Sequence, residues 1–192
     1  MAWLRYIAVD AAAAAVILLP LFLILCRCRL LPFRKASLLF LFSEYLCCLY
    51  SLVGLMTLPL LPYLRFEPNI NLIPLLGIPE DWKNALLNVA LFVPMGLMLP
   101  LLWQDLRGGL RTMRTGFALS LGIELLQILS GRATDINDLI TNVLGTVIGY
   151  GFFRTLPVQW QAHCTPFQRK LVFALVIAVM FFVQPYIAAL AY

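Results

Sequence analysis

Residues 84–104 read NALLNVALFVPMGLMLPLLWQ, and these 21 residues carry no charge. A helix rises about 1.5 Å per residue and needs about 20 apolar residues to cross a bilayer, so this stretch predicts a transmembrane helix. Similar apolar runs predict further spans, and the expected set is 8–26, 38–60, 84–104, 114–131, 136–154 and 170–191. We therefore expect an all-α fold, a polytopic transmembrane helix bundle of about six spans that forms a single membrane domain over residues 1–192.

The composition supports a membrane protein. Of the 192 residues, 62% are hydrophobic and 12% are charged, whereas a soluble domain carries about 25% charged residues. The net charge of +5 does not indicate nucleic-acid binding, because the basic residues gather at the ends of apolar runs and form no basic stripe. The five cysteines and the single histidine, His163, match no disulfide framework or metal-ligand spacing. We expect no metal and no cofactor.

The distribution of basic residues predicts the orientation. Ten of the 14 Lys and Arg residues fall in alternate connections or at their edges, beginning with the cluster Arg27, Arg29, Arg34 and Lys35. The positive-inside rule makes these connections cytoplasmic, so both termini are expected outside the cytoplasmic membrane. Because the basic cluster follows the first apolar run instead of preceding it, we expect that run to stay attached as a helix and not to be a cleaved signal peptide.

Polar side chains recur within three consecutive predicted spans. Polar groups in a bilayer are costly, by about 2.5 kcal/mol or more for a carboxylate near its centre, so each needs a partner. Glu124 is expected about 10 Å below the outer end of its helix, and amides of the neighbouring spans lie at a similar level. We predict one buried polar site that opens to the outside and binds a ligand, and its residues are Asn84, Asn88, Glu124, Gln127, Arg132, Asp135, Asp138 and Asn142.

Helix packing is the alternative explanation for some of these residues. Polar side chains also join membrane helices, each bond contributing about 0.6 kcal/mol, and this explains Asn84 and Asn142 adequately. Gly145 and Gly149 form a small-xxx-small motif, which predicts close helix contact. Glu124 is harder to explain by packing, because an unpaired carboxylate at that depth is costly. Arg132, in the short turn between two spans, could pair with Glu124 or Asp138.

The outer connection at residues 61–83 contains four prolines, which exclude a continuous helix. Its run at 71–76, NLIPLL, is too apolar for a free loop. We expect it to lie in the headgroup region or to fold back over the bundle.

Several motifs resemble one family when they are taken in order. They are NLIPL at 71–75, NVALFVPMG at 88–96, GIELLQ at 122–127, Arg132, Asp135, DLITN at 138–142 and Gly145. Together they are similar to the VanZ-like family of membrane proteins, over a motif core of residues 68–151. The resemblance implies a polytopic protein of the bacterial cell envelope, from a family whose namesake is associated with reduced susceptibility to teicoplanin, a lipid-bearing glycopeptide. It places Asn88, Glu124, Gln127, Arg132, Asp138 and Asn142 at the family's polar positions and transfers no catalytic residue.

Three functions remain open at this point. The first is a binding or shielding protein that engages membrane lipids, a lipid-linked cell-wall precursor or a lipoglycopeptide at the outer leaflet. The second is a membrane-embedded enzyme that modifies a lipid head group with Glu124 or Asp138 as general acid or base. The sequence favours the first, because it shows no nucleophile–base pair, metal set or phosphate-binding glycine loop. The third is a small proton-coupled transporter or channel, which is disfavoured because no inverted repeat and no broken helices in matched halves are visible. A purely structural role stays open.

Overall fold

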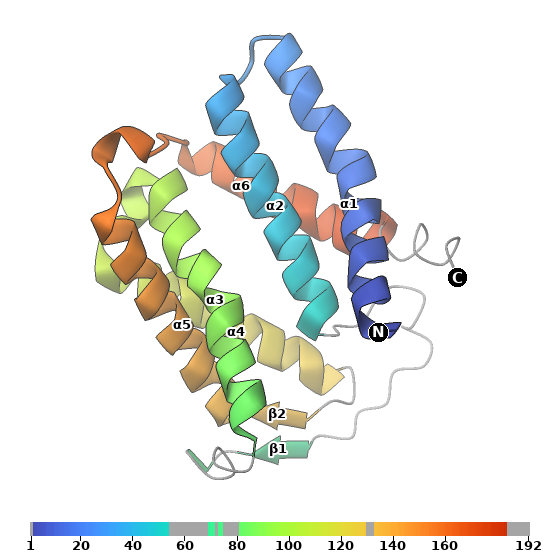
Figure 1. Cartoon of the computed structure of the whole chain (residues 1–192), viewed down its shortest axis with the longest axis vertical. Helices are drawn as coiled ribbons and strands as arrows, with labels where there is room; N and C mark the ends of the chain where they lie inside the picture. Colours follow the sequence, from blue (N-terminus) through green and yellow to red (C-terminus); the bar gives the residue numbers. More distant parts are fainter. Residues whose placement is uncertain (1, 54–68, 72, 75–80, 130–132, 184–192) are drawn as a thin grey trace. The chain divides into compact units, whose positions relative to one another are not determined.

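The computed structural model describes residues 2–53, 69–71, 73–74, 81–129 and 133–183. Within this part of the chain the fold is all-α, with six α-helices and two three-residue strands (Figure 1). The helices are α1 Ala2–Arg27, α2 Phe33–Val53, α3 Trp82–Leu102, α4 Gly109–Leu129, α5 Ile136–Thr155 and α6 Pro166–Ala178, and α6 continues as a π-helical turn, Val179–Val183. The strands are β1 Asn69–Asn71 and β2 Ala133–Asp135. The predicted all-α class is confirmed.

Three of the described helices are long and apolar enough to cross a membrane. They comprise Ala8–Arg27, Phe33–Val53 and Trp82–Leu102. The helices α4 and α5 are about as long but carry more polar residues, and their crossing of the membrane stays a prediction, as does that of α6. Large hydrophobic side chains point outward on α3, α4 and α5, among them Leu86, Leu125, Leu144 and Phe152. Such a surface suits contact with lipid, because water would oppose an apolar surface of this extent.

The chain forms two compact units. The first comprises Met1–Pro62 and His163–Tyr192, and the second comprises Tyr63–Ala162. The motif core at residues 68–151 falls entirely within the second unit. That residues 1–192 act as a single membrane domain stays a prediction.

In the first unit, α1 packs along α2 and aromatic side chains join the helices. Phe22 of α1 meets Phe40 of α2 edge to face, and Phe42 of α2 meets Phe173 of α6 in the same way. The helix α1 ends with Arg29 in the left-handed region, at φ 55°. The amide of Arg29 bonds to the Cys26 carbonyl and that of Leu30 to the Leu25 carbonyl, a Schellman arrangement that ends the helix.

The second unit is organised by close contact between α3 and α5. A Cβ atom placed on Gly145 would collide with the Val89 carbonyl oxygen, and one on Gly149 would collide with the Val93 carbonyl oxygen. Only glycine permits this approach of two backbones, so the small-xxx-small motif forms the predicted helix contact. The helix α4 also packs against α5, and Gly116 of α4 faces the Thr146 side chain of α5.

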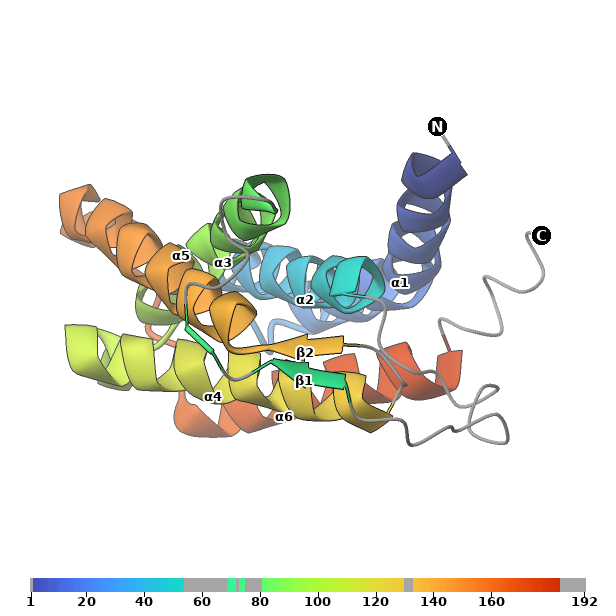
Figure 2. The same ribbon diagram turned by 90° about the horizontal axis from the view of Figure 1, so that it is seen from below.

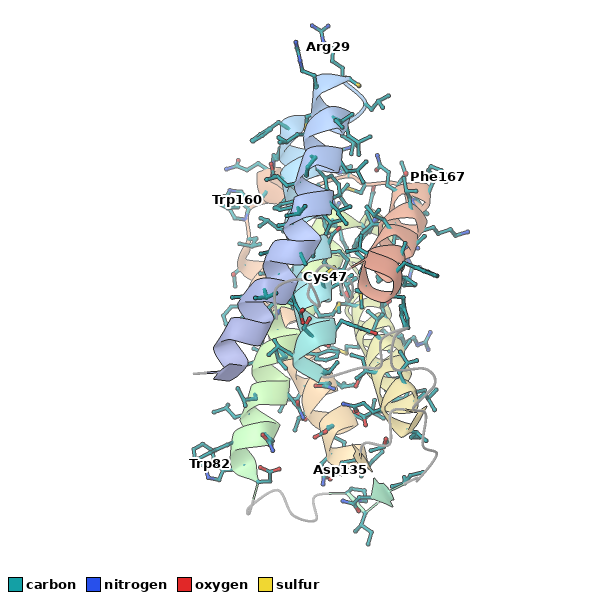
Figure 3. All side chains as sticks on the ribbon, turned by 90° about the vertical axis from the view of Figure 1, so that its right-hand side faces the viewer. Arg29, Cys47, Trp82, Asp135, Trp160 and Phe167 are labelled. Carbon is teal, nitrogen blue, oxygen red and sulfur yellow. The ribbon has the colours of Figure 1, made fainter. Side chains whose placement is uncertain are left out.

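Two ends of the second unit can be distinguished in Figure 3. Trp82 and Asp135 lie at one end and Trp160 lies at the other. At the Trp160 end, Arg107 donates to the carbonyl oxygens of Pro100 and Ala162, and the Tyr150 hydroxyl donates to the Arg107 carbonyl. By the predicted topology the Trp82 end faces outward, and we call it the outer end.

The predicted orientation can be tested with the native thiols of the first unit. Cys28 is exposed after α1, whereas Cys164 is 5% exposed. Burial raises the pKa of the Cys164 thiol, although nearby Lys35 acts in the opposite direction. In single-cysteine variants we expect maleimide to label Cys28 at least about tenfold faster than Cys164, because the reactive thiolate must be exposed. A membrane-impermeant maleimide should label Cys28 only in opened cells. Labelling of intact cells would contradict the orientation.

Candidate functional site

The outer end of the second unit is fastened by the two short strands. The strands β1 and β2 pair in parallel, with Asn71 opposite Asp135 (Figures 1 and 2). The Asp135 carboxylate accepts from the Asn137 backbone amide at 2.8 Å, which caps α5, and from Asn71 Nδ2 at 3.2 Å. The Asn71 side chain also accepts from the Ile73 amide, at 3.1 Å. Asp135 therefore holds the start of α5 to β1, which lies in the outer connection at residues 61–83. This is a structural role.

Directly inside this fastening lies a group that we call the acidic cluster, made of Asn88, Glu124 and Asp138. The three residues come from α3, α4 and α5. Asn88 Nδ2 donates to Asp138 Oδ1 at 2.7 Å. The Glu124 carboxyl lies within electrostatic range of Asp138 and accepts a hydrogen bond from the Asp135 backbone amide. Glu124 is only 4% exposed, whereas Asn88 and Asp138 are half-buried.

The Glu124 carboxyl is incompletely paired. Its Oε2 atom is buried and has no hydrogen-bond partner among the described residues. A buried acceptor without a donor costs about 1–3 kcal/mol, and more when it is charged. In native proteins such atoms are few, so this one is a candidate contact for a ligand.

A second polar pair lies one helical turn deeper, between α4 and α5. Asn142 Nδ2 donates to the Ser120 hydroxyl at 2.9 Å. Ser120 precedes Glu124 by four residues and Asn142 follows Asp138 by four, so both pairs lie on the same seam between the helices. Asn142 is 4% exposed, and its Oδ1 atom is also buried without a partner in the described part of the chain.

The comparison with protein families decides what kind of protein carries this arrangement. The family model described as VanZ/LLP1 matches residues 42–157, more than half of the chain. The chain belongs to the VanZ/LLP1 family. The resemblance predicted from the ordered motifs is thus confirmed, and the match contains the acidic cluster and both strands. Comparisons with curated proteins and with solved structures gave no significant match.

The structure does not bring all eight predicted site residues of this family member together. It brings together Asn88, Glu124 and Asp138, and it sets Asn142 one turn below them. Asp135 adjoins the cluster but uses its carboxylate to fasten β1 and α5. Gln127 is buried on α4, at 8% exposure. Arg132 lies outside the described residues, so its suggested pairing with Glu124 or Asp138 stays untested.

Asn84 is placed away from the cluster. It is exposed and donates to Asp81 at 2.7 Å, at the start of α3. The four-residue spacing of Asn84 and Asn88 puts both on one helix face, but Asn84 lies a full turn nearer the helix end. A role of Asn84 in binding stays a prediction.

Two polar residues around the cluster were not among the predicted site residues. The Thr134 hydroxyl donates to the Glu124 carbonyl oxygen at 3.2 Å, and Asn137, 5% exposed, supplies the amide that Asp135 caps. The sequence Asp-Ile-Asn at 135–137 carries a usable signal, since aspartate before an apolar run is a common helix N-cap. No comparable signal marks Thr134. Among the described residues, no three His, Cys, Asp or Glu side chains are grouped to hold a metal ion.

Proposed function

We propose that this VanZ/LLP1 family member is a cell-envelope membrane protein that binds the polar head of an amphiphile at the acidic cluster. One observation carries the proposal: Glu124 is almost fully buried, and one of its carboxylate oxygens has no donor among the described residues. Packing alone gives no reason to retain such a group, because an apolar residue of similar volume would avoid the desolvation cost.

The position of the cluster suits an amphiphile. Asp138 lies about 3 Å, Glu124 about 8 Å and Asn88 about 9 Å from the outer ends of their helices at a helical rise of about 1.5 Å per residue. The surrounding helix surfaces are apolar, with Leu86 and Leu125 more than half exposed. A ligand could therefore place its head at the cluster while its tail stays among lipid tails.

The outer end also bears an interfacial anchor. Trp82, at the start of α3, is 55% exposed, and the Lys83 ammonium lies 5.9 Å from the centre of its ring. Tryptophan and lysine in this arrangement are typical of the membrane–water interface. The acidic cluster thus lies just below the predicted headgroup level, within reach of a lipid-linked cell-wall precursor or the acylated part of a lipoglycopeptide.

The proposal predicts that the cluster determines susceptibility to teicoplanin. In a sensitive host that expresses this chain, Glu124→Gln and Asp138→Asn should each abolish most of the protection, because each replaces an ionisable carboxyl by a neutral amide of similar volume. The measurement is the minimal inhibitory concentration at equal membrane expression, determined by immunoblot.

Asp105→Asn is the matched control. Asp105 is an acidic residue of the same unit near the Trp160 end, so its substitution changes the net charge equally and leaves the cluster intact. Protection should persist in this variant. Equal protection by all three variants at equal expression would refute a role for the acidic cluster in shielding.

A second candidate is an enzyme that acts on a lipid head group, and the proximity of Glu124 and Asp138 favours it. Two neighbouring carboxyls rarely ionise together, so one can hold a proton while the other accepts one, as general acid–base catalysis requires. Mass spectrometry of envelope lipids incubated with the purified chain would reveal a product that Glu124→Gln fails to form. A purely binding role predicts unchanged lipids.

A further inference from the structure

We infer that the head group bound at the acidic cluster is a primary ammonium and not a phosphate or a neutral sugar. The inference rests on the proposed function and specifies its ligand. It would cover amphiphiles whose polar end carries an unsubstituted amine, such as an amino sugar, an aminoacyl group or an ethanolamine.

The hydrogen-bonding groups at the cluster are predominantly acceptors. Glu124 Oε2 and, one turn below, Asn142 Oδ1 are buried oxygens without a partner in the described part of the chain. Asn88 uses one N–H of its amide for Asp138, which leaves the amide oxygen as an acceptor and the second N–H as a donor. Buried acceptors are satisfied only by N–H or O–H donors. This excludes a fully ionised phosphate, which brings acceptors alone.

The charge of the cluster then separates an ammonium from a sugar. Glu124 and Asp138 are carboxyls from different helices, and Asp135 supplies a third carboxylate next to them. A hydroxyl group could donate to these oxygens but carries no charge opposite to that of an ionised carboxylate. An ammonium donates three hydrogen bonds and offsets the charge, and bonds between ionised partners are about twice as strong as neutral ones.

The helix arrangement matches the geometry of an ammonium. Its three N–H bonds diverge, and the cluster draws acceptors from α3, α4 and α5, one residue from each. The Glu124 carboxyl of α4 lies within electrostatic range of Asp138 on α5, and Asp138 accepts a hydrogen bond from Asn88 of α3. A quaternary ammonium carries the same charge but has no N–H, so it should be rejected.

The test is a series of amphiphiles with one tail and four head groups. The full-length chain, solubilised in a polyoxyethylene detergent at pH 7, is titrated with dodecylamine, dodecyltrimethylammonium, dodecyl phosphate and dodecyl glucoside, and binding is measured by calorimetry. We expect dodecylamine to bind at least about tenfold more tightly than the other three, because hydrogen bonds between ionised partners are about twice as strong as neutral ones. Glu124→Gln should remove this preference, and Asp105→Asn should preserve it.

Arg132→Ala completes the design, because Arg132 precedes β2 in sequence. If this arginine made the site a phosphate receptor, dodecyl phosphate would bind most tightly and Arg132→Ala would abolish its binding. That result would overturn the ammonium inference and sustain the proposed function. Equal binding of dodecylamine and dodecyl glucoside, with both dependent on Glu124, would have the same consequence. Binding of all four probes that is indifferent to Glu124 and Asp138 would overturn the proposed function itself.

Discussion

Substituting Gly149 by alanine is expected to destabilise the second unit by about 3 kcal/mol, the upper part of the range for overpacking a tight contact. A Cβ atom at this position would overlap the Val93 carbonyl oxygen and lie 2.9 Å from the Leu97 backbone nitrogen. Both neighbours are backbone atoms of α3, so neither can rotate away and the two helices must separate. Equilibrium unfolding in detergent, followed by tryptophan fluorescence, would measure the loss.

Gly151→Ala is the matched control in the same helix. Nothing lies within 4 Å of a Cβ atom built on Gly151. Alanine also favours a helix over glycine by up to about 1 kcal/mol, so this variant should be as stable as the parent or slightly more so. If the two variants unfolded alike, the close contact of α3 with α5 would be wrong. Because α3 and α5 supply Asn88 and Asp138, Gly149→Ala should also impair ligand binding.

The helices were predictable from hydropathy because a bilayer imposes a length on apolar segments. The predicted spans 84–104 and 136–154 correspond to α3 at Trp82–Leu102 and α5 at Ile136–Thr155. The predicted starts of α2, α4 and α6 were late by about a turn. In each case one or two basic residues lie in the first turn of the helix: Arg34 and Lys35 in α2, Arg111 in α4 and Arg169 in α6. Hydropathy detects only the part that lies in hydrocarbon, whereas the helix continues into the headgroup region, where such side chains are solvated.

The acidic cluster was predictable in part. The four-residue spacings along α4 and α5 indicated which polar residues share a face, and depth indicated that Asn88 and Glu124 lie at one level. The spacing could not show that Asn84 bonds locally to Asp81 instead of joining the cluster. Such a choice depends on tertiary position, and a helix terminus offers a nearby alternative partner.

The two strands were not predictable from the sequence. Each has three residues, too few for a periodic pattern, and 64 residues separate the paired Asn71 and Asp135. The apolar run that begins at Asn71 was expected to lie at the headgroups or to fold back, and its first residue does pair with the segment before α5. Residues 72, 75 and 76 of that run lie outside the described residues.

Asp135→Ala is expected to destabilise the second unit by about 2 kcal/mol, because it removes a helix cap worth about 1 kcal/mol and a hydrogen bond to a charged group. The lost bonds are those from the Asn137 amide and from Asn71 Nδ2. The amide that Asp135 donates to Glu124 belongs to the backbone and stays in place. Hydrogen exchange of peptides that cover β1 should accelerate, since Asn71 loses its side-chain partner. Equilibrium unfolding would measure the change in stability.

Asp81→Ala is the control for Asp135→Ala, because it removes an acidic residue at the outer end without removing a side-chain helix cap. Asp81 occupies the N-cap position of α3 but makes no side-chain bond to the helix backbone, and its contact with Asn84 is exposed. Its substitution should change stability by less than about 0.5 kcal/mol, as is usual for exposed positions. Equal losses of stability in Asp81→Ala and Asp135→Ala would show that charge, and not the fastening of β1 to α5, governs the stability of the outer end. We expect the loss of stability to be confined to Asp135→Ala, and this variant should keep the preference for dodecylamine at a temperature where it is folded. Such a result would assign Asp135 to holding the site, and Glu124 and Asp138 to contacting the ligand.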